Sequence, residues 1–467
     1  MFSKPPRPDW HPDLGAAPAC PPGFPPGFLW GAATSAYQIE GSPLADGAGA
    51  SIWHRFSHTP GTIANGETGD LACDHYRRFP DDVRLMRELG LQAYRFSVSW
   101  SRVLPEGRGR VNPKGLAFYQ RLVDRLLDHG IAPVVTLYHW DLPVALDERG
   151  GWANRDVAHW FADYACLLYR SLGDRIELWI TLNEPWVVME GGYIAGTLAP
   201  GRRDLAEGAR VSQNLLLAHG QAVRAYRAEG RHAIGIAVNL EPKYPASGSR
   251  ADRAATVRAD AYMNRQFLDP IFRGEHPAEI REMFGAAWPE LSDGDLELVR
   301  SPIDFLGVNY YTRGLTRHDP AVQPHRARNV CKAIGQTTEM GWEVCPEGLI
   351  DMLEWVKACY GNPPIYITEN GAAFPDPLPC QGIVDDPLRV AYLRDHLRAA
   401  HAALARGVDL RGYFAWSLLD NFEWAEGYSK RFGLVSVDHE TQARIPKASA
   451  RFYTEVIDTH GACLSDR

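Results

Sequence analysis

Two glutamates stand directly after short apolar runs, and their residue type suits acid–base and nucleophilic chemistry. Glu184 ends the run in WITLNEP, and Glu369 ends the run in IYITENG. Cleavage of a glycosidic bond needs two carboxyl groups, one to protonate the departing oxygen and one to attack or to activate water. One such glutamate alone is more often a helix cap or an arginine partner, but two at equivalent places favour catalysis. A separation of about 5 to 5.5 Å between them would indicate direct attack and retention of configuration.

The residues that follow each glutamate predict how its side chain is presented. Pro185 disfavours the α region for the residue before it, so we expect Glu184 to be extended at the end of a strand. Asn370 and Gly371 tolerate positive φ, so we expect a sharp turn directly after Glu369. Both carboxyl groups should then face the same mouth of the fold.

Eight short apolar segments alternate with longer amphipathic ones, which is typical of a parallel sheet built from βα units. The expected strands are 28–33, 93–98, 132–137, 178–182, 234–239, 305–310, 365–368 and 413–418. Nearly every position in them is apolar, as in strands that are covered on both faces. We therefore predict an α/β fold, a single (β/α)8 TIM barrel with elaborated βα loops, in which the glutamates follow strands four and seven.

Helices are expected between the strands, and one domain is expected overall. Segments 81–89, 115–130 and 389–404 are amphipathic, and Gly407 is a plausible C-cap for the last of them. Residues 1–27 are rich in proline and have no periodicity, so they are predicted to form a tail on the surface. Residues 28–467 are predicted to form the catalytic barrel, because no linker or shift in composition divides them.

Composition limits the partners and the location of the protein. A net charge of −8 offers no basic surface for nucleic acid or a membrane, so a small uncharged substrate is expected. The 14 Trp and 19 Tyr suit a pocket that stacks on sugar rings. Eight scattered cysteines without a CxxC pair, and no apolar export or membrane segment, predict a cytoplasmic protein with reduced thiols. The oligomeric state stays open.

The motifs around the two glutamates resemble those of glycoside hydrolase family 1. TLNEP and ITENG are similar to its acid/base and nucleophile motifs, and FLWGAATSAYQIEG is similar to its N-terminal signature. AYRFSVSWSRVLPEGRGR, TLYHWDLP, GVNYYT, MGWEVCPEGL and WSLLDNFEWAEGYSKRFGL follow in the family's order, so the resemblance extends from residue 28 to about residue 457. It implies a retaining β-glycosidase, most simply a β-glucosidase, that forms a covalent glycosyl-enzyme and uses no cofactor.

The resemblance also implies a role for each residue near the bond that is cleaved. Glu369 would attack the anomeric carbon, while Glu184 would donate a proton to the leaving group and later take one from water. Arg95 and Tyr311 would hydrogen-bond the nucleophile, with Asn309 in support. A guanidinium beside Glu369 favours its ionised form, and the resulting charge should raise the pKa of Glu184.

A sugar pocket and its entrance follow from the same resemblance. The residues implied for the glycone are Gln38, His139, Trp140, Asn183, Trp416, Glu423 and Trp424, and those for the aglycone are Trp342 and Trp186. Asn183 would hold the 2-hydroxyl group, and the carboxylate of Glu423 would repel a 6-phosphate. Asn239 and Phe432 are expected around this pocket, and Glu426 and segment 374–387 near its entrance.

The sequence disfavours several alternative functions. A metal-dependent hydrolase is disfavoured because the histidines form neither HxH nor HExxH, and no metal is expected at the site. A serine hydrolase is disfavoured because no GxSxG motif occurs. A sugar-binding or myrosinase-like protein would lack one of the two glutamates. Some transglycosylation is expected, and the choice among glucosides, galactosides, fucosides and short oligosaccharides such as cellobiose stays open.

Overall fold

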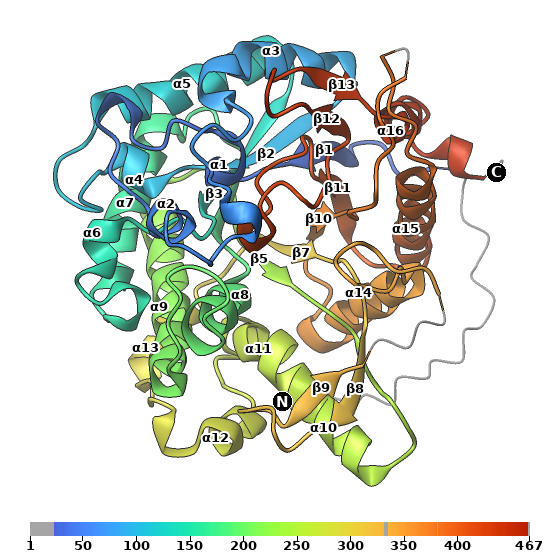
Figure 1. Ribbon diagram of the computed structural model, residues 1–467. Coiled ribbons are helices and arrows are strands. Elements are labelled where there is room, and N and C mark those ends of the chain that lie inside the picture. The colour runs from blue at the N-terminus through green and yellow to red at the C-terminus, as the bar shows by residue number, and fades with distance from the viewer. Residues whose placement is uncertain (1–22, 331–334, 381, 466–467) are drawn as a thin grey trace.

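Eight parallel strands close a barrel in the computed structural model, which describes residues 23–330, 335–380 and 382–465. Around the barrel the order is β1, β2, β3, β4, β5, β7, β10 and β11 (Figure 1). Their bounds are Leu29–Ala33, Ala93–Ser97, Ala132–Tyr138, Leu178–Asn183, Ala233–Asn239, Phe305–Asn309, Ile365–Asn370 and Leu410–Trp416. These are the eight segments expected from the sequence, and the predicted TIM barrel is confirmed.

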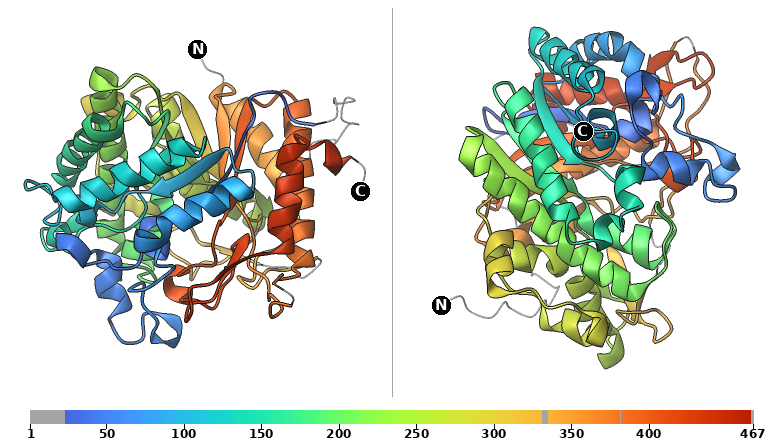
Figure 2. Two further views of the ribbon diagram at one scale, coloured as in Figure 1. Left: turned by 90° about the horizontal axis from the view of Figure 1, so that it is seen from above. Right: turned by 90° about the vertical axis from the view of Figure 1, so that its left-hand side faces the viewer.

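Helices surround the strands on the outside of the barrel, as the further views in Figure 2 show. They are α3 (His75–Glu88), α5 (Pro113–Asp128), α7 (Val157–Leu172), α9 (Leu205–Glu229), α11 (Gln266–Arg273), α14 (Pro346–Tyr360), α15 (Pro387–Ala405) and α16 (Ala448–Asp458). The three expected helices fall within α3, α5 and α15 to within two residues at their ends. Gly407 follows α15 with φ +78°, and its N–H donates to the carbonyl of Leu404, so the predicted glycine stop is present. None of the helices in these described ranges has the length and apolar character needed to cross a bilayer.

The residues beyond a minimal barrel are placed mainly in the connections that follow the strands. Further helices there are α1 (Ala36–Ile39), α2 (Ile52–Ser57), α4 (Trp100–Val103), α6 (Val144–Asp147), α8 (Pro185–Met189), α10 (Arg250–Asp260), α12 (Ala278–Phe284) and α13 (Asp293–Val299). Small sheets join β6 (Lys243–Pro245), β8 (Gly314–His318) and β9 (Ala327–Asn329), and β12 (Val435–Val437) with β13 (Arg444–Pro446). The longest connections follow β1, β5, β7 and β11, at the end of the barrel where TIM-barrel enzymes build their sites.

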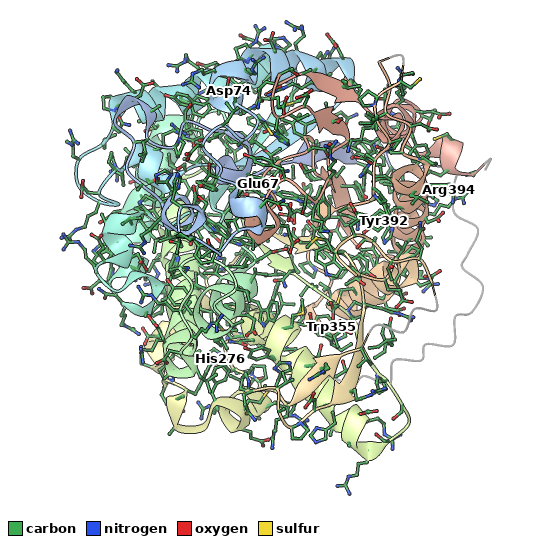
Figure 3. All side chains as sticks on the ribbon, viewed as in Figure 1. Glu67, Asp74, His276, Trp355, Tyr392 and Arg394 are labelled. Carbon is green, nitrogen blue, oxygen red and sulfur yellow. The ribbon has the colours of Figure 1, made fainter. Side chains whose placement is uncertain are left out.

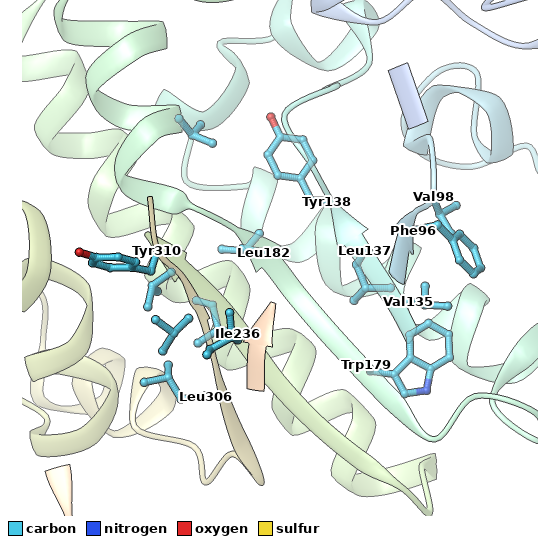
Figure 4. Close-up of a cluster of buried hydrophobic side chains, with 14 of the residues drawn as sticks. Phe96, Val98, Val135, Leu137, Tyr138, Trp179, Leu182, Ile236, Leu306 and Tyr310 are labelled. Carbon is cyan, nitrogen blue, oxygen red and sulfur yellow. The ribbon is translucent and has the colours of Figure 1, made fainter. Parts of the chain in front are cut away.

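Alternate residues of each strand serve two different cores. On β3, Val134 packs inside the barrel, whereas Val135 and Leu137 pack outward against the helices (Figure 4). Since side chains alternate along a strand, Arg95 shares the inward face of β2 with Ala93. The barrel interior is therefore apolar at one end and carries polar groups towards the other.

The first described residues pack against the barrel. The Phe24 ring is buried 4.8 Å from the Trp30 ring, and the Phe24 amide donates to the carbonyl of His460 at 2.7 Å. Residues 1–22 lie outside the described residues, so the proposed tail stays a prediction for that segment.

The chain after Glu369 does not use the positive φ angles that were expected at Asn370 and Gly371. Asn370 still belongs to β10, and neither it nor Gly371 has positive φ, so that prediction was wrong. Glycine is needed at 371 because a Cβ there would lie 1.7 Å from the carbonyl oxygen of Trp416. The close approach of β11, which a single sequence does not reveal, fixes this residue type.

We expect Gly371→Ala to lower the free energy of unfolding by about 3 kcal/mol or more, because the backbone of β11 has to move to admit the methyl group. Urea unfolding measures the effect. Gly248→Ala is the matched control, since a Cβ at Gly248 meets nothing within 4 Å and should change stability by less than about 0.5 kcal/mol. Equal stability of the two variants would contradict the steric explanation.

Candidate active site

Glu184 and Glu369 converge at the carboxyl end of the barrel strands. Their exposed fractions are only 6% and 3%. Glu369 lies in β10 opposite Asn309 of β7, and Asn309 Nδ2 donates to Glu184 Oε1 at 2.8 Å. The side chain of Asn309 thus contacts Glu184, while its backbone is paired with that of Glu369. The oxygen-to-oxygen separation of about 5 to 5.5 Å stays a prediction.

The backbone at Glu184 is left-handed, with φ +48° and ψ 62°, and the predicted extended conformation was wrong. Pro185 excludes only the right-handed α region for the residue before it, and the left-handed region satisfies the same restriction. The Glu184 amide donates to the carbonyl of Ala237 at 2.9 Å, which anchors this conformation. The Glu184 side chain makes no cap bond to α8, so its carboxyl group is left for the cavity.

Both oxygens of Glu369 are held by separate donors. Arg95 Nη1 donates to Oε1 at 2.6 Å, and the Tyr311 hydroxyl donates to Oε2 at 2.6 Å. Arg95 is itself buried, and its Nη2 donates to Asn183 Oδ1 at 2.6 Å. The strand is fixed from behind, since Asn370 Nδ2 donates to the hydroxyl of Tyr392, which Figure 3 labels. These contacts fix the orientation of the Glu369 carboxyl group.

The pKa of Glu184 is raised mainly by burial, whereas the sequence predicted that the charge of Glu369 would raise it. Burial is the largest cause that raises the pKa of Glu184, to about 8, and the charge of Glu369 comes second. Burial also raises the pKa of Glu369, but Arg95 and Tyr311 oppose this rise. Because Glu184 has no cation in contact, it is the group that keeps a proton at neutral pH.

His139 has one ring nitrogen without a hydrogen-bond partner in the described structure. Its Nε2 lies 3.1 Å from Asn183 Nδ2, which can only donate, so Nε2 is the acceptor and Nδ1 carries the proton. Burial, and then the charge of Arg95, lowers the pKa of His139 well below its usual value, so the ring is neutral. Nδ1 is buried and has no partner in the described part of the chain, as expected of a group that awaits a substrate hydroxyl.

The remaining residues implied for the glycone gather around this histidine. The His139 ring stacks against Trp416 and Trp424, each at 5.8 Å, and Trp140 lies 4.7 Å from Trp424. On the other side Gln38 Nε2 donates to Glu423 Oε2 at 3.3 Å. Burial, and then the charge of Glu369, raises the pKa of Glu423 to about 8.

A cavity of about 500 Å³ opens outward from Glu184 and Tyr311. Trp186, Trp342, Asn239 and Glu426 line it at the positions that the sequence implied. Phe432 contacts the rings of Tyr311 and Trp342. The described part of segment 374–387 lines a separate cavity and none of this one, and its expected place near the entrance stays a prediction. Its Asp376 forms buried ion pairs with Arg389 and Lys447.

Part of the outer wall was missed by the sequence reasoning. Tyr262, Glu190, His325, Met263 and Lys243 line the cavity, and the Tyr262 ring stacks 4.7 Å from His325. Except for Glu190, which follows α8, these residues come from the irregular connections after β5 and β7. No periodicity or motif marks them, so only the folded connections could have identified them.

Comparisons with known proteins give a consistent result. The chain matches the model of glycosyl hydrolase family 1 over residues 21–462. It is 51% identical to Beta-glucosidase A of Thermotoga maritima over 444 residues, 94% of this chain and 98% of that one. A bifunctional beta-D-glucosidase/beta-D-fucosidase of Bifidobacterium breve is 44% identical, with 94% and 99% covered. The family 1 b-glucosidase from Thermotoga maritima in complex with isofagomine lactam gives a TM-score of 0.91 at 51% identity, with 94% and 99% covered.

We expect Glu369→Gln to lower the pKa of Glu184 below about 8, because the charge of Glu369 is removed. The pKa should stay above 4.5, because burial remains. Titration by NMR of carboxyl-labelled glutamate measures it, with Glu184→Gln to assign the signal. Glu190→Gln is the control, since Glu190 lines the same cavity but is not among the main causes of the Glu184 shift. An unchanged pKa in Glu369→Gln would show that the pair does not interact.

Proposed function

The chain belongs to glycosyl hydrolase family 1, and from this premise we propose that it is a retaining β-glucosidase. The family resemblance that the motifs carried is thereby confirmed. The enzyme removes terminal non-reducing β-D-glucosyl residues from β-glucosides and short oligosaccharides such as cellobiose. The arrangement that carries the proposal is the pair of buried carboxyl groups, one held by Arg95 and Tyr311 and the other by Asn309.

In the first step the two carboxyl groups act on opposite sides of the glycosidic bond. An oxygen of ionised Glu369 attacks the anomeric carbon, and protonated Glu184 gives its proton to the departing oxygen. The bond to the aglycone breaks as the ester to Glu369 forms. The neutral His139 donates from Nδ1 to a sugar hydroxyl, and Asn183 holds the 2-hydroxyl, a contact that strengthens as positive charge develops on the ring.

In the second step Glu184 changes its role. Formation of the ester removes the charge of Glu369, which lowers the pKa of Glu184 and leaves it ionised as a base. Glu184 takes a proton from water, the hydroxyl attacks the anomeric carbon, and Glu369 leaves as a carboxylate. A second sugar in place of water gives transglycosylation through the same intermediate. The two carboxyl groups carry both steps, so the proposal needs no cofactor.

The choice of substrate follows from the glycone pocket. The carboxyl group of Glu423, to which Gln38 donates, accepts hydrogen bonds from sugar hydroxyls, and in its ionised form it repels a 6-phosphate. Because one epimeric hydroxyl changes only one or two hydrogen bonds, β-galactosides and β-fucosides are also substrates of the proposed enzyme. The bifunctional relative and the inhibitor-bound structure support a small glycoside as the partner. A cytoplasmic location belongs to the same proposal, supported by the six cysteines of the described residues, which are all free.

Replacement of each carboxyl group should give a different defect. We expect Glu369→Gly to abolish release of nitrophenol from nitrophenyl β-glucoside. We expect Glu184→Ala to slow deglycosylation by about 10² to 10⁴ fold, with added azide restoring turnover and yielding the β-glycosyl azide. Release by the wild-type enzyme should not change with EDTA. Recovery of the α-azide from Glu184→Ala would overturn the assignment of roles.

The activity should fall at alkaline pH for substrates that need a proton. Glu184 is protonated below its pKa of about 8, so kcat/KM for an alkyl β-glucoside should drop by about tenfold per pH unit above that value. A dinitrophenyl glucoside leaves without a proton, so its kcat/KM should stay level over the same range. A fall with both substrates would assign the alkaline limb to another group such as Glu423, whose pKa is also about 8.

A further inference from the structure

Two histidines and an aspartate form a cluster outside the catalytic cavity, in the connection between β1 and α3. His54 lies in α2, and His58 is the C-cap of that helix four residues later. His54 Nδ1 lies 3.4 Å from Asp70 Oδ1, and His58 Nε2 lies 3.0 Å from Asp70 Oδ2. Within the described ranges, no other group of three His, Cys, Asp or Glu side chains brings its ligand atoms within 4.8 Å of one another.

In this cluster, imidazole nitrogens face the oxygens of Asp70 without a proton or a cation between them. His58 Nδ1 lies 2.7 Å from the carbonyl oxygen of His54, which only accepts, so Nδ1 carries the proton. In a neutral ring Nε2 then has a lone pair, and it faces a carboxylate oxygen that also has only lone pairs. His54 Nδ1 is buried beside the same carboxylate and makes no well-aligned hydrogen bond in the described structure. A second proton on His58 or a bound cation is needed between these atoms.

We propose that His54, His58 and Asp70 bind one divalent cation of the zinc type. Two imidazole nitrogens and one carboxylate are ligands that Zn²⁺ accepts, and neutral imidazole suits it better than it suits Mg²⁺ or Ca²⁺. Bonds of about 2.0 to 2.1 Å in a tetrahedral site place the ligand atoms about 3.3 to 3.4 Å apart. The 3.4 and 3.0 Å distances are close to this spacing. Burial of His54 lowers its pKa, which keeps the ring neutral.

One coordination position of the site is open to solvent. The side chains of His58 and Asp70 are 42% and 48% exposed, so water can complete a tetrahedral shell and the ion can exchange. His54, at 18%, forms the covered side. The site is thus accessible to an added metal ion without opening of the fold.

The ion would join helix α2 to the segment around Asp70, and both contact residues next to the sugar pocket. The Trp53 ring, next to His54, lies 4.5 Å from the Trp424 ring. Two residues before Asp70, the carbonyl of Thr68 accepts from the Tyr428 hydroxyl at 2.7 Å, and Glu67, labelled in Figure 3, accepts from the Tyr428 amide at 2.6 Å. The cation would therefore stabilise the wall behind Trp424, and it takes no part in the hydrolytic steps.

The test uses the full-length enzyme after chelation and dialysis. Isothermal titration with ZnCl₂ should show one site that is lost or weakened by at least about tenfold in His54→Asn and in Asp70→Asn, since loss even of an outer-shell partner weakens metal binding by roughly 10 to 100 fold. Zn²⁺ should raise the Tm of the wild-type enzyme and not that of the variants. Circular dichroism would show that each variant is folded.

His129→Asn is the matched control. Its Nδ1 lies 2.9 Å from the carbonyl oxygen of Arg125, four residues earlier, as in His58, but no carboxylate or second histidine completes a site there in the described structure. This variant should bind Zn²⁺ as the wild type does. The proposal is overturned if the wild type shows no such site, which would leave a protonated His58–Asp70 ion pair, or if all three variants bind Zn²⁺ equally.

Discussion

The contact between Arg95 and Glu369 is the interaction on which the site depends. At one end of the barrel Glu184 and Glu369 are buried and Glu423 is partly buried, and burial of a carboxylate is costly unless a charge or a hydrogen bond compensates for it. Arg95 contacts only one of the three, at 2.6 Å. The carboxyl group of Glu369 is therefore the one best able to remain ionised. Glu184 and Glu423 have pKa values of about 8, so they are protonated at neutral pH. Glu369 and Glu184, which are proposed to act as nucleophile and acid, thus differ because a single cation lies beside only one of them.

The position of that cation is a consequence of barrel geometry. Alternation along β2 turns Arg95 inward, and its guanidinium reaches Thr136 on β3, Asn183 on β4 and Glu369 on β10. Asn309 on β7 completes the network by donating to Asn183 and to Glu184. The register of these strands is fixed by the apolar residues that alternate with the polar ones, such as Ala93 and Val134 inside the barrel. A slip of one residue in a strand would turn its polar group towards the helices and break the network.

The parts that sequence could predict are those set by local periodicity and by motifs. The eight strands, the Gly407 helix stop and the convergence of Glu184 with Glu369 follow from patterns a few residues long. The left-handed backbone of Glu184 and the reason for Gly371 depend instead on Ala237 and Trp416, which are distant in sequence. The outer wall around Tyr262 lies in connections that have no repeating pattern. Long-range packing decides these features, and a single sequence does not display it.

The same burial that prepares the site makes the fold more sensitive to alkaline pH. For a carboxyl group with a raised pKa, the folded state binds a proton more tightly than the unfolded chain. Glu184 and Glu423 have pKa values near 8 in the fold and 4.5 in the unfolded chain, so their contribution to stability is undiminished below pH 4.5 and is lost as pH rises towards 8. At neutral pH these two groups therefore lower the free energy of unfolding, and the extensive core between strands and helices offsets this loss.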